Sequence, residues 1–547
     1  MAATDRRHHD DNRNVDTKLQ DEQITEVASN ATTSQTTSQT NDEQQTLWQN
    51  VKKYRKVVLY TFGLTSAILL YGYDNVVVGT VSAMPMFQKD FGIIDPKSPP
   101  GTEKWILPSD WLALWNVASP LGAMGGALLG GWFQDRVGRR IALAVSSFLS
   151  AVAVAIMYVS YLPTDIQGRR ACFFAGKFGQ GAAIGAVMAS TQTYMSEILP
   201  TALRGSGMAF FPVFTLLGQL TGALVIYGSL NQSKGYAVAF GSQWPFSFVP
   251  IVIAYFIPES PAYYVRKNQI DKALNAQARL DPPGTDTKAV VERIQATIAH
   301  EAQFAKVTFM ECFHKRNFRR TFIVMWANSF TAVFGLPLLA KASYFLQIVG
   351  MKANTSIIFL IMGIILGLIA NAVSVWVMSR VHRRPLILST LSITAGLWLS
   401  MGIANCFKSK AVVWWTAASM MLAIIVCGVG VWPASFAVAA ETSSLQLRAR
   451  TQGIGWTVSA FTTAASGIAL PYIFNPDQGN LRGKVGFTYV GACLVGVVIT
   501  WYVVPDMKGR SVAEIDRMFE LEVPARRFRG WKEEGEVDSS GVGRAWV

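Results

Sequence analysis

Charged residues are scarce in this chain and are missing from long stretches of it. Asp, Glu, Lys and Arg together make up 15% of the 547 residues, whereas they make up about a quarter of an average soluble protein. Half of the residues are hydrophobic, and they gather in runs of about 20, the length that a helix needs to cross a bilayer. The composition therefore excludes an ordinary soluble protein and indicates a membrane protein with many spans.

Cysteine is also rare, and the motifs of common enzymes are missing. The five cysteines stand far apart, at positions 172, 312, 406, 427 and 493, and their spacing fits neither a metal site nor a disulfide framework. The chain has no GxSxG elbow, Walker A loop or HExxH motif. The glycines of GKFGQGAAIG (176–185) lie inside an apolar run, where they favour close helix contact over phosphate binding. We therefore expect no enzymatic activity, no metal and no cofactor.

The net charge of +14 does not indicate a nucleic-acid partner, because the basic residues gather in alternate loops. Arginines cluster at 134–140 and 380–384, and the basic segment HKRNFRR ends at residue 320. Basic loops of membrane proteins stay in the cytoplasm. We therefore expect a multi-pass protein in a lipid bilayer, with both termini cytoplasmic and no nucleic acid as partner.

Twelve apolar segments predict an all-α polytopic fold. They lie near 57–80, 109–133, 141–161, 171–194, 204–228, 243–257, 321–348, 354–379, 385–405, 411–438, 451–474 and 485–505. A polar segment after the sixth contains amphipathic stretches that predict short helices. The expected parts are a disordered cytoplasmic tail (1–56), an N-terminal six-helix bundle (57–258), a cytoplasmic central loop (259–320), a C-terminal six-helix bundle (321–505) and a cytoplasmic tail (506–547).

An internal repeat supports two related halves. DRVGRR (135–140) matches SRVHRR (379–384), at an offset of 244 residues. SEILPTALRG (196–205) matches AETSSLQLRA (440–449) at the same offset. Parallel repeats of this kind are typical of transporters that bind their substrate between the halves, near the middle of the membrane.

These motifs resemble those of the major facilitator superfamily, and within it those of the sugar porters. PESPAYYVRK (258–267) and PDMKGRSVAEIDRMFE (505–520) are similar to two signatures of that family. SYFLQIVGM and VPARRF are most similar to fungal maltose and α-glucoside permeases. The resemblance implies two pseudo-symmetric bundles that transport sugars by alternating access, commonly together with a proton.

Asp74 is the one charged residue between Lys56 and Lys89, in the middle of the first span. A charge at mid-membrane costs at least about 2.5 kcal/mol, so it is retained where it has a partner or a function. The resemblance implies that an acid at this position and a basic residue in the fourth span, here Lys177, take part in proton coupling. A buried pair that only holds two helices together is the alternative.

Charged residues at the cytoplasmic helix ends are expected to form a gate. The resemblance implies an ion-pair network that holds the outward-open state and breaks when the site opens inward. Two glutamates and two arginines recur at the offset of the repeat, which favours a gate over a role in topology alone. The expected gate residues are Asp135, Arg139, Glu197, Arg204, Glu259, Arg383, Glu441 and Arg448.

The predicted substrate site keeps only part of the pattern expected for hexoses. Gln219 matches a sugar-contacting glutamine of the family, but the glutamine pair usual in the seventh span is missing. Trp432 and Phe436 in the tenth span are candidates for stacking or gating, and ordinary packing is their alternative. Asn328 is a further polar group that could line the site or pair between helices.

Lys341 lies within the seventh span, where the family usually has an aromatic residue. An intramembrane cation indicates a functional site by default. Lys341 could bind an anionic substrate, pair with Asp74 across the two halves, or extend to the membrane surface. The sequence alone leaves these three roles open.

The leading prediction for function is proton-coupled uptake of a sugar, of the α-glucoside or hexose type, across the plasma membrane. One alternative is transport of a non-sugar or anionic metabolite, inward or outward, on the same scaffold. Another is a nutrient sensor that does not transport. Asn231 begins an Asn-Gln-Ser sequon in an outer loop, so we expect it to be glycosylated.

Overall fold

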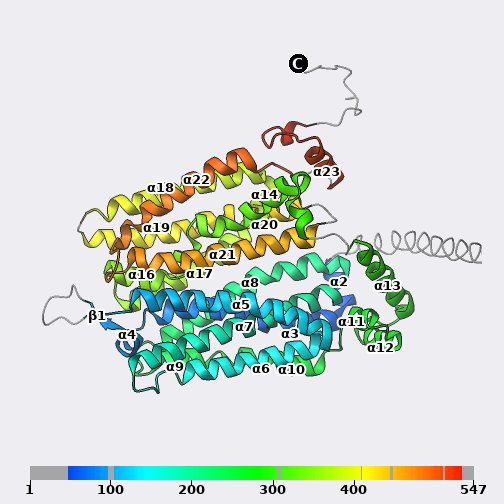
Figure 1. The fold of residues 1–547 in the computed structure, drawn as a ribbon, viewed down its shortest axis with the longest axis horizontal. Coiled ribbons are helices and arrows are strands. Elements are labelled where there is room, and N and C mark those ends of the chain that lie inside the picture. Colours follow the sequence, from blue (N-terminus) through cyan, green and yellow to red (C-terminus); the bar gives the residue numbers. More distant parts are fainter. Residues whose placement is uncertain are drawn as a thin grey trace, which may run out of the picture.

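The computed structural model describes residues 47–95, 104–304, 309–407, 409–443, 447–508, 510 and 512–531. Long helices run side by side in two groups, which Figure 1 shows as a blue-to-teal N-terminal half and a green-to-orange C-terminal half. The N-terminal spans are α3 (Arg55–Val81), α5 (Ser109–Val137), α6 (Arg139–Tyr158), α7 (Ile166–Ile198), α8 (Thr201–Ser229), and α9 (Gly235–Gly241) with α10 (Trp244–Phe256). The C-terminal spans are α14 (Lys315–Val333) with α15 (Leu336–Leu339) and α16 (Ala342–Val349), α17 (Ala353–Arg380), α18 (Arg383–Ala404), α19 (Lys410–Val429) with α20 (Val431–Thr442), α21 (Arg448–Phe474) and α22 (Gly486–Val503).

Eleven helical stretches in the described part of the chain are long and apolar enough to cross a membrane. The span outside this set is α7, whose sequence includes Lys177, Gln180 and several serines and threonines. It packs against α5 and α6 inside the N-terminal half (Figure 1). With α7, the twelve predicted spans are accounted for, and the all-α fold of two halves is confirmed.

Three spans are broken rather than continuous, and a proline follows each break. The seventh and tenth are broken inside the predicted ranges, whereas the sixth is longer than the predicted 243–257 because α9 precedes it. In the seventh span, Gly335 adopts a left-handed conformation (φ 95°) before Pro337. The tenth span breaks at Gly430, before Pro433, and the sixth breaks between α9 and α10, before Pro245. Proline has no N–H, and its ring clashes with the carbonyl four residues earlier, so a continuous helix does not form there.

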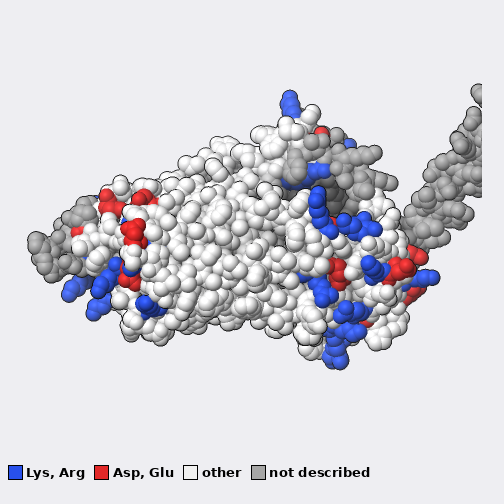
Figure 2. Space-filling model, turned by 60° about the horizontal axis from the view of Figure 1, so that its bottom comes forward, with Lys and Arg blue, Asp and Glu red and all other residues white. Residues whose placement is uncertain are grey.

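The two ends of the helix bundle carry different elements. One end, called the basic end below, carries α2 (Leu47–Lys53), α11 (Pro261–Arg266), α12 (Ile270–Leu280), α13 (Thr287–Phe304), η1 (Phe309–Phe313), α23 (Val512–Glu520) and η3 (Phe528–Gly530). The other, called the opposite end, carries α4 (Pro85–Phe91), η2 (Arg482–Val485) and the antiparallel strands β1 (Ile93–Ile94) and β2 (Trp105–Ile106). Figure 2 shows charged side chains at both ends and a wide belt without them, as a bilayer requires.

The predicted N-terminal tail is partly folded, which corrects the boundary at residue 56. Residues 47–53 form α2, and α3 begins at Arg55. Val51 and Tyr54 pack against a buried apolar cluster of the N-terminal half. Burial of their apolar side chains stabilises this segment, whereas the polar residues expected in the tail have little apolar surface to bury. Residues 1–46, which hold most of the predicted tail, lie outside the described part.

The central loop contains the predicted short helices, and the second bundle begins earlier than predicted. Helix α12 covers the stretch IDKALNAQARL, whereas α14 starts at Lys315 instead of residue 321. After the twelfth span, α23 packs against the start of α14, where Asp516 contacts the guanidinium of Arg320. Residues 532–547 lie outside the described part.

Glycines let α5 and α7 approach each other closely, as the sequence predicted. A Cβ atom at Gly126 would lie 1.9 Å from the backbone oxygen of Ala182. A Cβ atom at Gly185, within GKFGQGAAIG, would lie 2.3 Å from the backbone oxygen of Ala123. No real side chain fits at such distances, so these two positions require glycine.

Candidate functional site

Asp74 lies in the middle of α3 and is sealed inside the N-terminal half. One oxygen of its carboxylate contacts the ammonium of Lys177 on α7, and the other accepts a hydrogen bond from Ser119 Oγ at 2.7 Å. Lys177 Nζ also donates to the backbone oxygen of Asp74 at 2.9 Å. Asp74 is 3% exposed and Lys177 1%. The structure therefore places the two predicted residues in one buried ion pair.

A further set of buried polar side chains, missed in the sequence, begins one turn along α7. Gln180 Oε1 accepts a hydrogen bond from Ser150 Oγ of α6 at 3.1 Å. The hydroxyl of Ser150 lies 2.9 Å from that of Ser247 on α10. All three side chains are fully buried. Serine and glutamine are common in loops and on helix surfaces. The sequence therefore gives no signal that separates these three buried side chains from exposed serines and glutamines.

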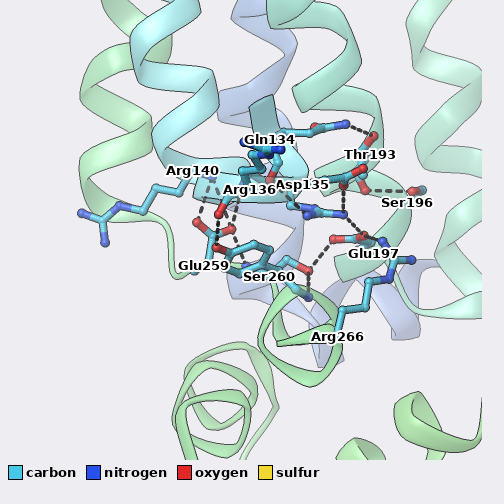
Figure 3. A network of polar contacts seen from close by, with 12 residues as sticks. Gln134, Asp135, Arg136, Arg140, Thr193, Ser196, Glu197, Glu259, Ser260 and Arg266 are labelled. Atoms are coloured by element: carbon cyan, nitrogen blue, oxygen red, sulfur yellow. Dashed lines mark hydrogen bonds and ion pairs between the residues drawn. The ribbon is translucent and has the colours of Figure 1, made fainter. Parts of the chain in front are cut away.

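Arg139 is the centre of an ion-pair network at the basic end of the N-terminal half. Its guanidinium lies 3.1 Å from a carboxylate oxygen of Asp135 and 3.1 Å from one of Glu197. Figure 3 shows both acids in this network, with Arg266 of α11 beside Glu197. Arg139 is almost fully buried. The carboxylates of Asp135 and Glu197 therefore have to offset the cost of removing its positive charge from water.

Glu259 caps the N-terminus of α6, also within this network (Figure 3). Its carboxylate accepts hydrogen bonds from the backbone N–H groups of Arg139 and Ser260, both at 2.9 Å, and of Arg140 at 3.1 Å. Burial raises the pKa of this carboxyl above the usual range, although the three hydrogen bonds act in the other direction. Glu259 therefore fixes the end of the sixth span to the start of the third.

The C-terminal half repeats this arrangement at the offset of 244 residues. Arg383 lies 2.9 Å from Glu441 and donates to the backbone oxygen of Met378 at 3.0 Å. Arg139 makes the matching bond to the backbone oxygen of Gln134 at 3.2 Å. The repeat seen in the sequence is therefore also a repeat of contacts.

Each of these ion pairs joins helices of one half. They tie the ends of neighbouring helices together within a half, and their role as a gate between the halves stays a prediction. Arg204 and Arg448 are also predicted gate residues, and their side chains lie outside what the structure describes.

The hydrogen bonds found between the halves lie at the opposite end, and we call this set of contacts the outer seam. Asp477, after α21, accepts hydrogen bonds from the backbone N–H of Ser109 at 2.8 Å and from its hydroxyl. Asn475 donates to the backbone oxygen of Leu107 at 2.8 Å, and the hydroxyl of Tyr344 accepts from the backbone N–H of Leu107 at 3.2 Å. The start of α5 is thus held by the end of α21.

Gln347 of α16 completes the outer seam. Its amide nitrogen donates to the backbone oxygen of Ala83 at 2.6 Å, and its amide oxygen accepts from Gln88 at 2.9 Å. Ser343 donates to the backbone oxygen of Gly79 at 3.0 Å. The two halves are therefore closed against each other at the opposite end, and the sequence offered no signal for these pairs because they join segments more than 200 residues apart.

The predicted substrate residues lie on three helices, α8, α14 and α20, and at the α15–α16 break. Gln219 is half-buried on α8. Asn328 is buried on α14, where its amide donates to the backbone oxygen of Val324 at 2.9 Å. Trp432 packs near Phe334, and Phe436 is 42% exposed beside Trp456. Their part in binding stays a prediction.

Lys341 stands at the break between α15 and α16, in the seventh span. It is half-buried, and among the described residues its ammonium has no hydrogen-bond or ion-pair partner. Gly79 of α3 lies against it, since a Cβ atom there would be 3.1 Å from the Cα of Lys341. Lys341 therefore lies between the halves, just below the outer seam.

Two repeated six-helix halves, closed against each other at one end and holding a buried ion pair, define a membrane transporter of the major facilitator fold. The chain belongs to the Sugar (and other) transporter family, whose profile matches residues 58–519. Its class is therefore a transporter and not an enzyme.

Similar proteins agree with this class. The chain is 30% identical to "MFS transporter fmqE" of Aspergillus fumigatus over 511 residues, covering 90% of this chain and 92% of that protein. It is 26% identical to the maltose permease MAL31 of Saccharomyces cerevisiae, covering 88% of this chain and 78% of that one. Among solved structures, the inward-open xylose transporter XylE of E. coli matches with a TM-score of 0.65 at 18% identity, over 84% of this chain and 99% of that one.

Proposed function

We propose that this transporter takes up a sugar of the α-glucoside or hexose type together with a proton. The observation that carries the proposal is the buried pair of Asp74 and Lys177, the one acid–base pair away from the helix ends in the described spans of the N-terminal half. A carboxylate held away from water, against one cation and one hydroxyl, binds a proton when the cation moves away and releases it when the cation returns.

The outer seam supplies the second part of the mechanism. The halves are closed at the opposite end, so a site between them is reached from the basic end. The positive-inside rule makes the basic end cytoplasmic, which puts both termini in the cytoplasm and gives the structure an inward-facing state. Alternating access then requires the outer seam to open while the basic end closes.

The names of similar proteins support a sugar as cargo. MAL31 is named a maltose permease and MPH3 an α-glucoside permease, and a solved structure of similar fold is titled a D-xylose–proton symporter. We place the protein in the plasma membrane. Asn231 lies exposed between α8 and α9 at the opposite end, where a glycan would face the outside.

Uptake of labelled maltose and glucose into cells that lack sugar transporters tests the proposal. Sugar addition should make the external medium more alkaline, and Asp74→Asn should abolish this change while sugar exchange continues. Asp110→Asn is a matched control, because Asp110 is an exposed acid in the first turn of α5. Uptake that is unaffected by Asp74→Asn, or that moves no protons, contradicts the proposal.

A further inference from the structure

We propose that the cargo carries a carboxylate or similar anionic group and that Lys341 binds it between the halves. For a sugar porter this makes the substrate class a sugar acid. The inference rests on the proposed function for the sugar part of the cargo, and on Lys341 alone for its charge.

The balance of charge inside the spans is the first argument. Away from the helix ends, the described spans contain one acid, Asp74, and its carboxylate is already committed to Lys177 and Ser119. Lys341 therefore leaves one positive charge without a counter-charge. A cation held at membrane depth is costly, and an anionic cargo that enters between the halves offsets this cost.

The position of Lys341 in a broken span is the second argument. Transporters of this kind bind substrates where a transmembrane helix is discontinuous. The backbone N–H of Lys341 bonds to Leu338, and its carbonyl accepts from Phe345 at the start of α16. The backbone is thus satisfied locally and the ammonium is left for another partner. The eight residues of α16 also direct the positive end of their dipole toward this point.

The helix geometry of α3 argues against Asp74 as the partner. Lys341 contacts α3 at Gly79, five residues after Asp74, and five residues turn an α-helix by about 140°. Asp74 accordingly faces α5 and α7, whereas Gly79 faces the seventh span. Asp74 and the contact with Lys341 therefore lie on different faces of α3.

The position of Lys341 along the seventh span argues against an extended chain that reaches the membrane surface. Beyond Lys341, α16 continues for eight residues, or about 12 Å toward the opposite end. This is farther than a lysine side chain reaches. The part of the outer seam made by Ser343, Tyr344 and Gln347 also lies on that path.

Binding to the purified full chain in lipid nanodiscs tests the inference. D-galacturonate and D-galactose form a matched pair of probes that differ by the carboxylate. We expect the wild type to bind the acid at least tenfold more tightly than the neutral sugar. Lys341→Met should remove this preference and leave neutral-sugar affinity within about twofold, while Lys341→Arg keeps a preference for the acid. Lys234→Met, at an exposed loop lysine, is the control and should behave as wild type.

The melting temperature of each variant without ligand confirms that it is folded. A wild type that binds the neutral sugar as tightly as the acid, with no change in Lys341→Met, overturns the inference but leaves proton-coupled sugar uptake intact. Lys341-dependent binding of a carboxylate that is not a sugar, such as benzoate, supports the anion site and contradicts the sugar proposal. Binding of neither sugar nor any carboxylate overturns both.

Discussion

Asp477→Ala should shift the transporter away from the state described above. Asp477 accepts two hydrogen bonds from Ser109, one at 2.8 Å from the backbone N–H and one from the hydroxyl. Hydrogen bonds to a charged group contribute about 1.5–3 kcal/mol each. Asp477 is half-buried, so we discount the pair for competition by water and expect a loss of about 2 kcal/mol, or about thirtyfold in the equilibrium between the two states.

Spin labels at Arg136 and Arg380 measure this shift, in a variant that lacks the five native cysteines. Both residues are exposed at the basic end, one in each half, and they occupy matching positions of the repeat. In the wild type we expect mostly long distances between the two labels, because the proposed state faces inward. In Asp477→Ala we expect a larger population of short distances. Asp110→Asn changes a nearby acid outside the outer seam and serves as the control. An unchanged distance distribution in Asp477→Ala refutes the idea that these bonds hold the halves closed at the opposite end.

Three further changes test the packing and the basic end. Arg139→Gln removes the buried cation that Asp135 and Glu197 share and leaves only Arg266 beside Glu197. It should lower the stability of the purified protein by about 3 kcal/mol, and a melting temperature within error of wild type would contradict this. Gly126→Ala should prevent folding because of its clash with Ala182, whereas Gly125→Ala, with nothing within 4 Å of a new Cβ, should fold normally; equal yields would refute close packing of α5 and α7. Because the pKa of Glu259 is raised, its burial costs most when it is ionised, so the wild type should gain stability relative to Glu259→Gln as pH falls toward that pKa. A difference in melting temperature between the wild type and Glu259→Gln that does not change with pH would contradict the claim that the Glu259 carboxylate is buried.

The sequence predicted the fold well because lipid imposes long apolar segments, and these remain visible one helix at a time. The spans, the two halves and the pairing of Asp74 with a cation in the fourth span follow from hydropathy, a repeat and a family resemblance. The breaks at Gly335 and Gly430 were harder to predict, since a glycine followed by a proline is also found in helices that only bend.

The contacts between distant segments could not be predicted. Asn475 and Asp477 look like ordinary loop residues, and only the fold brings them to the start of α5. Lys341 shows the same limit: the sequence left three roles open. The arrangement of Asp74 and Gly79 on different faces of α3 removes one role, and the length of α16 removes another.

The most direct test of the central claim follows proton movement in intact cells during sugar uptake, in the wild type and in Asp74→Asn and Lys177→Met. We predict alkalinisation of the medium on sugar addition for the wild type, none for either variant, and retained exchange of labelled sugar in Asp74→Asn. Full alkalinisation in Asp74→Asn would contradict the assignment of the buried pair as the proton site.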